Sequence, residues 1–369
     1  MTHVTGPDGQ PQAPRLPHRA RLLVVAAYVL LGTAVVMDLA SDPRWTVSPV
    51  LATAPVLAGF GSRKALVPML VGLGALVLVA PLALADDEVP LLVHLTSGFT
   101  VLAITCVSTA NVLLVATRER ELLQSRSVAE AAQQTLLRPP PERLDGLRVA
   151  VRYLAAAAEA RVGGDLYETL ATPFGTRLLL GDVRGKGLSA IDTAAAVLGT
   201  FREAAQVEPS LAAVAGRLDA AMCRRRPGEE FVTAVLVQVA GPGRAELVNC
   251  GHLPPLLCRA GRVREVPAPV PQPPLALLGM VGDAYRGQAF VFERGDLLLL
   301  YTDGVTEARD AAGRFYPLAE RLAGMPESAP AALLDRVVAD LLAYAGGELS
   351  DDAALLAVRR EQSSCSTQR

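Results

Sequence analysis

The chain has 369 residues, of which 51% are apolar and 20% are charged, and its mean hydropathy is +0.33. With 35 basic and 37 acidic residues the formal net charge is −2, which excludes a nucleic-acid-binding protein that depends on a basic surface. The positive mean hydropathy excludes chain-wide disorder and a purely water-soluble single domain, because some apolar residues must face something other than water. The length predicts two or three domains.

Most of the apolar excess lies before residue 117, after a polar N-terminal stretch (residues 1–20) that is predicted to be disordered. The long apolar runs cover residues 22–40, 65–85 and 91–116. Each is long enough to cross about 30 Å of hydrocarbon as a helix. Residues 45–60 form a shorter apolar run with two prolines, which either spans the membrane or re-enters it.

Basic residues flank these runs on alternate sides. They are Arg15, Arg19, Arg21, Arg63, Lys64, Arg118 and Arg120. If residues 45–60 count as a span, all of them fall on one side, and such residues mark the cytoplasmic side. The sequence therefore predicts a four-helix transmembrane domain over residues 21–116, in the cell membrane, with the N-terminus and the C-terminal half in the cytoplasm. Asp38 and His94 lie near the predicted interfaces, so we expect structural roles for both.

Residues 117–138 form a polar, helix-prone connector that ends before Pro139. Val115, Leu122, Ala129 and Leu136 recur every seven residues. This spacing suits a two-stranded coil that would join two copies of the chain, although the other seam positions are polar. A single amphipathic helix lying on the following domain is an equally good interpretation.

From residue 139 to residue 360 strand-like and helical segments are arranged in blocks, followed by a predicted disordered tail (361–369). Strand patterns occur at residues 147–154, 176–183, 231–239, 244–251, 288–293, 296–304 and 353–360, and helical patterns at 188–206, 210–226 and 331–345. Two helical segments follow each other without a strand between them. This order predicts an α+β fold of antiparallel sheets with segregated helices.

Aspartates stand at the ends of several of these segments. Asp165 lies at a glycine turn, Asp182 and Asp303 end apolar strands, and Asp351 and Asp352 precede the last strand. One such residue would be a turn former, but several from distant segments could meet at one sheet edge. Carboxylates of this kind bind magnesium or manganese rather than zinc. The five cysteines form no C-x-x-C pair, so a zinc or disulfide site is not expected.

Six motifs in this order resemble the SpoIIE-like, RsbU-type branch of the metal-dependent (PPM-type) protein serine/threonine phosphatases. They are VGGDLYE, GDVRGKG, FVTAVLVQV, NCGHLPP, LLLYTDGVTEARD and SDDAALLAVR. The resemblance extends over roughly residues 133–360 and leaves the apolar N-terminal part uncovered. It implies a PPM-type two-sheet antiparallel β-sandwich flanked by helix pairs, here preceded by an all-α transmembrane domain.

The resemblance also implies a site with two Mn²⁺ or Mg²⁺ ions. Carried over by motif, Asp182 would bridge the ions and the Val183 carbonyl would add a ligand, Asp303 and Asp351 would complete the second ion's site, and Asp165 would hold the first. Asp182 and Asp303 are the expected catalytic residues, since two divalent ions activate a water that attacks phosphorus in line.

Several residues beside this set would support the ligands or contact substrate: Gly164, Arg184, Lys186, Gly304 and Asp352. Arg184 replaces the serine usual in the family, and we expect it to point into solvent. His252, in NCGHLPP, is expected to fix a turn by hydrogen bonds rather than act as a general acid.

The resemblance implies a membrane-anchored phosphatase that hydrolyses phosphoserine or phosphothreonine on a regulatory protein, namely a STAS-type anti-anti-sigma factor. Its other expected partners are the lipid bilayer and a second copy of the chain through the connector, with no nucleic acid. A catalytically silent phosphoprotein-binding scaffold and a small-molecule phosphohydrolase are the alternatives.

Overall fold

The computed structural model describes residues 18–40, 46, 48–85, 89–155, 163–225, 230–241, 243–281, 284–326 and 329–361. Most of the two predicted tails therefore lies outside the described residues. The chain divides into two compact units, Met1–Gln124 and Ser125–Arg369.

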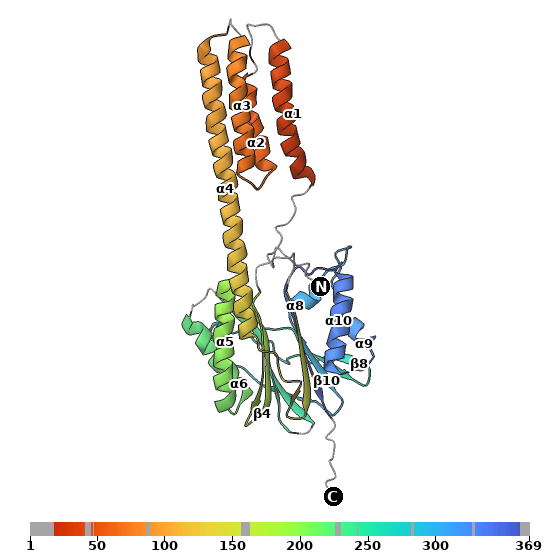
Figure 1. The fold of residues 1–369 in the computed structure, drawn as a ribbon. Helices are drawn as coiled ribbons and strands as arrows, with labels where there is room; N and C mark the ends of the chain where they lie inside the picture. Colours follow the sequence, from red (N-terminus) through yellow and green to blue (C-terminus); the bar gives the residue numbers. More distant parts are fainter. Residues whose placement is uncertain are drawn as a thin grey trace. The chain divides into compact units, whose positions relative to one another are not determined.

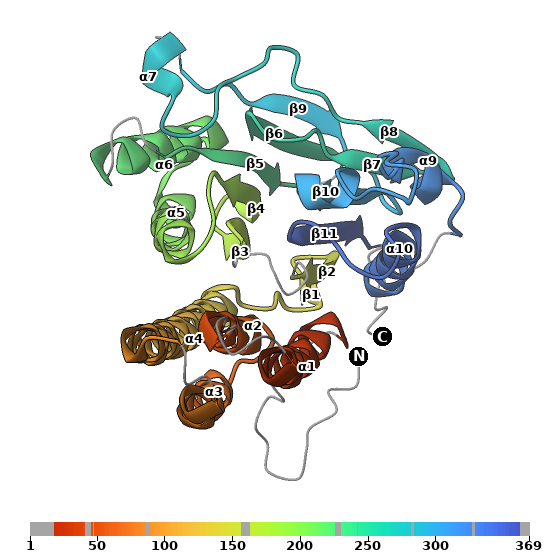
Figure 2. The ribbon, with the colours of Figure 1, turned by 90° about the horizontal axis from the view of Figure 1, so that it is seen from above.

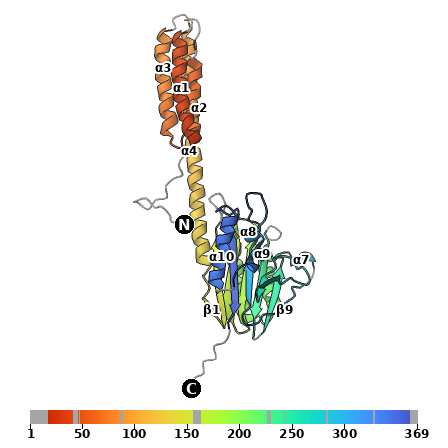
Figure 3. The same ribbon diagram turned by 90° about the vertical axis from the view of Figure 1, so that its right-hand side faces the viewer.

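The first unit is helical (Figures 1 and 3). Its elements are α1 (His18–Ala40), the 3₁₀ helix η1 (Ser48–Ala52), α2 (Thr53–Phe60), α3 (Leu66–Ala85) and the N-terminal part of α4 (Leu91–Leu136). Small side chains fill its interior, among them Ala27, Ala34, Ala54, Ala58 and Ala75. Small residues let helix backbones approach closely, which is how helices pack where hydrocarbon surrounds them.

Of the four predicted membrane spans, one has a described helix long and apolar enough to cross a bilayer, Leu91–Arg120. The other three coincide with shorter apolar helical segments, Leu22–Asp38, Ser48–Phe60 and Leu66–Pro81. The four-span topology stays a prediction.

The last apolar run and the predicted connector are not separate elements. Residues 91–136 form one continuous helix, α4, which ends three residues before Pro139. Proline cannot continue a helix and disfavours helical geometry in the residue before it, so the chain leaves the helix here.

The second unit is built from two antiparallel sheets (Figure 2). Its strands are β1 (Arg143–Leu144), β2 (Leu147–Leu154), β3 (Asp165–Thr172), β4 (Gly175–Val183), β5 (Val232–Val239), β6 (Arg244–Cys250), β7 (Leu256–Arg259), β8 (Arg262–Glu265), β9 (Gln288–Val291), β10 (Leu297–Tyr301) and β11 (Ala353–Arg360). The first sheet has the order β1-β2-β11-β10-β7-β8 and the second the order β3-β4-β5-β6-β9.

Helices cover the two sheets on separate sides, α5 and α6 near β3–β5 and α9 and α10 near β10 and β11 (Figure 2). Their bounds are α5 (Leu188–Val207), α6 (Leu211–Arg225), α7 (Leu278–Val281), α8 (Asp303–Thr306), α9 (Leu318–Ala323) and α10 (Pro330–Tyr344). The predicted α+β sandwich with segregated helices is confirmed.

Strand alternation explains how one sheet serves two cores. In β10, Leu298 and Leu300 belong to the cluster shared with the second sheet, α5 and α6, while Leu297 and Leu299 belong to the cluster shared with α10. Because successive side chains of a strand point to opposite faces, a strand buried on both faces is apolar throughout. This is why LLLLY reads as a continuous apolar run.

The sequence patterns missed four strands and three short helices of this unit. Strand β3 is the important omission, because its polar residues Asp165, Glu168 and Thr169 are buried and obscure the apolar alternation. The two carboxylates have side-chain partners: Glu168 Oε2 accepts a bond from Arg202 Nε at 2.6 Å, and Asp165 Oδ2 accepts one from the hydroxyl of Thr302.

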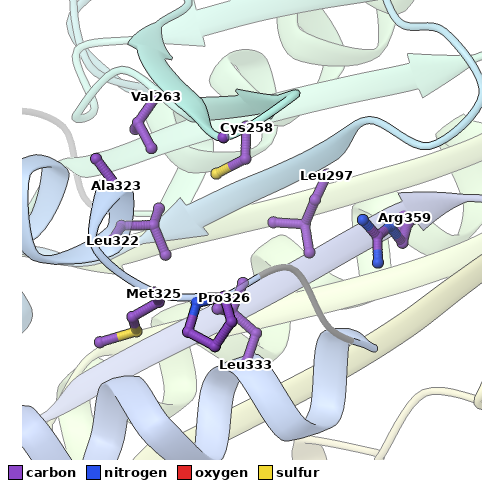
Figure 4. A pocket seen from close by; sticks show the side chains of 10 residues that line it. Cys258, Val263, Leu297, Leu322, Ala323, Met325, Pro326, Leu333 and Arg359 are labelled. Carbon is purple, nitrogen blue, oxygen red and sulfur yellow. The ribbon is translucent and has the colours of Figure 1, made fainter.

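A small apolar cavity of about 40 Å³ lies between the first sheet and α9 and α10 (Figure 4). Its lining includes Cys258, Leu297, Leu322, Met325 and Leu333. Leu297 begins β10, whereas Asp303 follows the end of that strand, so this cavity is not part of the aspartate site described below.

Candidate metal centre

Two aspartates come from each sheet. Asp165 begins β3 and Asp182 is the last residue but one of β4, and the antiparallel register of these strands places the two directly opposite each other. From the other sheet, Asp303 follows β10 and Asp351 precedes β11, and these strands are also paired neighbours. The convergence expected from the sequence is therefore produced by strand register.

Two local expectations were wrong. Asp165 is not in a turn but opens β3, and Asp303 does not end a strand: β10 stops at Tyr301 and Asp303 begins the short helix α8. A main-chain hydrogen bond explains why a helix begins here: Glu307 N donates to Asp303 O at 2.7 Å, which turns the chain away from the sheet.

Thr302 joins the two sheets at this edge. Its buried hydroxyl donates to Asp165 Oδ2 at 2.8 Å and accepts a bond from the main-chain N–H of Ala354 at 2.9 Å. One side chain thus fixes the orientation of the Asp165 carboxylate relative to both β10 and β11. No sequence motif marks Thr302 for this role.

The carboxylates are coupled electrostatically. Burial first, and then the charges of Asp303 and Asp351, raise the pKa of Asp182 to about 7. Burial and then Asp182 raise the pKa of Asp165, and burial and then Asp351 raise that of Asp303. Carboxylates that raise one another's pKa in this way form a site that gains stability from a cation.

A lysine ammonium already contacts this cluster. Lys186 Nζ lies 2.7 Å from Asp351 Oδ1, and both side chains are partly exposed. Lys186 stands in a loop in which Gly185 and Gly187 have positive φ angles (115° and 87°), a conformation that favours glycine. Arg184, in the same loop, is exposed and its guanidinium lies 5.1 Å from the centre of the Phe231 ring.

Two glycines of the motifs are required by close backbone contacts. A Cβ on Gly164 would lie 2.5 Å from the carbonyl oxygen of Val183, and Val183 N donates to Gly164 O at 3.2 Å. A Cβ on Gly304 would lie 1.8 Å from the carbonyl oxygen of Asp352. Both glycines therefore let the segments that carry the aspartates approach each other.

Asp352 is buried, and its carboxylate is bound by other buried polar groups. Its Oδ2 accepts bonds from the main-chain N–H of Gly163, at 2.7 Å, and from the hydroxyl of Tyr153. Burial raises the pKa of Tyr153 far above its usual value, and Asp352 adds to the effect, so this hydroxyl stays protonated and donates. No sequence pattern marks Tyr153, which stands in an ordinary strand-like run.

His252 has the structural role that the sequence predicts. Its Nδ1 pairs with Thr233 Oγ1 at 2.9 Å and its Nε2 with the carbonyl oxygen of Tyr301 at 3.1 Å. Burial lowers its pKa to about 4. A neutral imidazole with both nitrogens engaged braces β5 against the end of β10.

The donor chemistry fits hard divalent cations. Four carboxylates and the Val183 carbonyl supply oxygen only, which Mg²⁺ and Mn²⁺ prefer. Among the residues that the structure describes, no three Asp, Glu, His or Cys side chains are close enough together to ligate one ion without adjustment. Their mutual pKa shifts and the Lys186 contact nevertheless show a cluster that attracts positive charge.

Comparison with known proteins identifies the family of the chain. The sequence profile of the family described as Stage II sporulation protein E (SpoIIE) matches residues 172–361, a little over half of the chain. The RsbU and RsbW domains of Rv1364c from Mycobacterium tuberculosis are 27% identical, with a TM-score of 0.52, over 62% of this chain and 63% of that one.

A second solved structure supports the fold alone. The SiaA-PP2C domain of Pseudomonas aeruginosa is 20% identical, with a TM-score of 0.54, and the match covers 66% of this chain and 98% of that domain. The chain thus belongs to the SpoIIE family, and its second unit is a PP2C-type phosphatase domain.

Proposed function

We propose that this protein is a membrane-anchored, metal-dependent phosphatase that hydrolyses phosphoserine or phosphothreonine on a regulatory protein. The observation that carries the proposal is the meeting of Asp165, Asp182, Asp303 and Asp351 at one edge of a PP2C-type sandwich. Family membership supports the reaction class, and the oxygen-only donor set supports Mn²⁺ or Mg²⁺.

The four aspartates and the Val183 carbonyl would hold the cations. Two divalent ions, when bound, would neutralise phosphate charge and lower the pKa of the attacking water. Thr302 orients Asp165, and Lys186 shares the charge of Asp351. Arg184 stands exposed beside Asp182, where a guanidinium can pair with a substrate phosphate.

For the substrate we propose a phosphorylated STAS-type anti-anti-sigma factor. The support is the relative in which an RsbU domain and an RsbW domain share one chain. The site is open to solvent, because Asp303 and Arg184 are exposed and Asp182 is half-buried. An exposed site suits a phosphorylated side chain on a folded protein surface better than a small ester that needs enclosure.

For the membrane we propose four spans, with both the N-terminus and the phosphatase domain in the cytoplasm. The support is the one helix of sufficient length, the apolar exterior of the other three helical segments, and the basic residues at Arg63, Lys64 and Arg118. A C-terminal tag should be digested by protease in inside-out vesicles and protected in right-side-out ones. The opposite result would overturn this orientation.

We also propose that two copies of the chain pair through the polar part of α4.

The decisive test follows phosphate release by the full-length protein in detergent. The substrates are a phosphoserine-bearing STAS protein and p-nitrophenyl phosphate, each with manganese or with a chelator. We expect manganese-dependent release from the phosphoprotein, lost by at least about 1,000-fold in Asp303→Asn because the ligand set loses a charge. Asp335→Asn is the matched control, since Asp335 is an exposed α10 residue paired with Arg152.

Each alternative has its own result in this assay. Release from p-nitrophenyl phosphate but not from phosphoproteins would favour a small-molecule phosphohydrolase. Tight binding of the phosphoprotein without release, by wild type and Asp303→Asn alike, would favour a silent scaffold.

A further inference from the structure

A line of hydrogen bonds runs from helix α4 to the aspartate cluster within the second unit. Gln133, one turn before the end of α4, donates from Nε2 to the Tyr153 hydroxyl at 2.8 Å. That hydroxyl donates in turn to Asp352 Oδ2. Gln133 and Asp352 are 7% and 5% exposed, so these bonds are shielded from water.

The same groups also bind the segment that leads into β3. Gly163 N donates to Asp352 Oδ2 at 2.7 Å, and Gln133 Nε2 lies 3.4 Å from Gly163 O. Gly163 has no room for a side chain, because a Cβ there would lie 2.2 Å from Asp352 Oδ2. Gln133, Tyr153 and Asp352 therefore hold the main chain two residues before Asp165.

Asp352 also lies directly against the other aspartates. Its main-chain N–H donates to Asp351 Oδ1 at 2.9 Å, and its carbonyl oxygen abuts Gly304, next to Asp303. A change in the position of Asp352 would therefore move Asp351 and the Asp303 turn relative to Asp165. These are the aspartates of different sheets, whose spacing decides whether they can close on cations.

We infer that Gln133 and Tyr153 are positioning residues for the metal centre: through Asp352 they set the spacing of its carboxylates and so its affinity for divalent cations. The inference rests on the proposed function, and it makes the last turn of α4 part of the site. Groups that orient metal ligands typically change metal affinity by about 10–100-fold when they are removed.

The two residues should differ in size of effect. Tyr153→Phe removes the donor to Asp352 itself, so we expect the Kd for Mn²⁺ to rise about 10–100-fold. Gln133→Leu leaves the bond between Tyr153 and Asp352 in place and removes only the bond that the Tyr153 hydroxyl accepts from Gln133. We therefore expect a smaller rise in the Kd for Mn²⁺, roughly 3–10-fold. In the double variant, Gln133→Leu should add little to Tyr153→Phe, because the short bond of Gln133 is to the Tyr153 hydroxyl (2.8 Å) and its contact with Gly163 O is long (3.4 Å).

The experiment measures Mn²⁺ binding to the full-length protein in detergent by competition with a fluorescent chelator. Turnover of p-nitrophenyl phosphate is then followed against Mn²⁺ concentration. Two controls match the variants: Tyr344→Phe, whose exposed hydroxyl bonds Arg314 O and Phe315 O, and Thr135→Val, an exposed residue of the same α4 turn. A positioning role shifts the Mn²⁺ dependence and leaves turnover at saturating Mn²⁺ within about threefold of wild type.

The outcomes separate this inference from the proposed function. Unchanged Mn²⁺ affinity in both Tyr153→Phe and Gln133→Leu, with wild-type turnover intact, would overturn the inference alone. The expected affinity shifts without turnover of any phosphoester by wild type would support the inference and overturn the phosphatase proposal. Additive effects in the double variant would show that Gln133 does not act through Tyr153, and no Mn²⁺ binding by wild type would overturn both.

Discussion

The two units of this protein arrange their polar and apolar side chains in opposite ways. In the first unit the exposed side chains are large and apolar, such as Phe99 (72% exposed) and Phe60 (70%), while Ser48, Ser97 and His94 are buried. In the second unit three consecutive leucines, Leu178–Leu180, are fully buried, and Asp182, Asp303 and Asp351 lie at one edge of the sandwich, where Asp303 is exposed. The first pattern is expected where lipid is the solvent, and the second where water is.

The two units also differ in what their buried polar groups bind. In the first unit Ser48 Oγ bonds Ser97 Oγ at 3.1 Å and Thr46 Oγ1 bonds Asp38 Oδ1 at 3.1 Å, so polar side chains pair inside the helical unit. In the second unit the buried polar groups hold main-chain segments, as Asp352 and Thr302 do. Asp38 and His94 are thus buried within the first unit rather than at its surface.

The largest stability effect is expected at Arg177, a fully buried residue of β4. Its guanidinium donates to the carbonyl oxygens of Ala205, Glu208 and Pro209 at 2.6–2.8 Å. Arg177→Met would leave them without a partner, and we expect a loss of about 3–5 kcal/mol in the free energy of unfolding. Arg152→Met, at the surface, is the control.

The chain's aromatic residues allow this loss to be assigned to one unit. The only tryptophan, Trp45, belongs to the first unit, whereas six of the seven tyrosines belong to the second. Near-ultraviolet circular dichroism of tyrosine in urea should shift to lower denaturant in Arg177→Met while Trp45 fluorescence does not. A shared shift would mean that the units unfold as one.

The difference in solvent can be tested with an arginine on each exterior. Phe99→Arg places a charge on the exposed apolar surface of α4, within the membrane span that we propose, and should weaken membrane insertion by about 3 kcal/mol, seen as loss from the membrane fraction. Val207→Arg, on an exposed position of α5, should leave fractionation unchanged. Equal behaviour of the two variants would contradict the comparison.

The half-buried His252 gives the second unit a pH dependence. Burial lowers its pKa in the folded protein from 6.5 to about 4. Between these two pH values His252 is protonated in the unfolded chain but neutral in the folded one. The free energy of unfolding should fall as the pH drops from about 6.5 to about 4, by up to about 3 kcal/mol. Subtracting the profile of His252→Gln isolates this residue from the aspartates, and parallel profiles would contradict the assignment.

The smallest effect is expected at a helix contact of the first unit. A Cβ on Gly72 of α3 would lie 2.0 Å from Thr105 Oγ1 and 2.7 Å from Thr105 Cβ on α4. Gly72→Ala should therefore destabilise the helical unit by about 1–3 kcal/mol, read from Trp45 fluorescence during thermal unfolding in detergent. Gly74→Ala is the control, because a Cβ at Gly74 meets nothing within 4 Å, and equal melting of both variants would argue against this contact.

Local pattern was sufficient for much of this fold. Strands such as β4 and β11 and helices α5, α6 and α10 were predicted within a residue or two, because each carries a strong apolar periodicity. Strand β3 was missed, since it buries Asp165 and Glu168, whose partners Thr302 and Arg202 lie far away in sequence. The end of β10 was placed too late, because the main-chain turn at Asp303 has no composition signal.

The sequence by itself determined that the apolar excess lies in the first third of the chain, that the C-terminal part is a sandwich, and that the aspartate motifs follow one family's order. The tertiary structure alone decided which strands pair, which carboxylates face each other, and that Gln133 and Tyr153 lie behind Asp352. The reason is physical: periodicity and turn chemistry act over a few residues, whereas a hydrogen bond between residues 199 positions apart depends on how whole sheets pack.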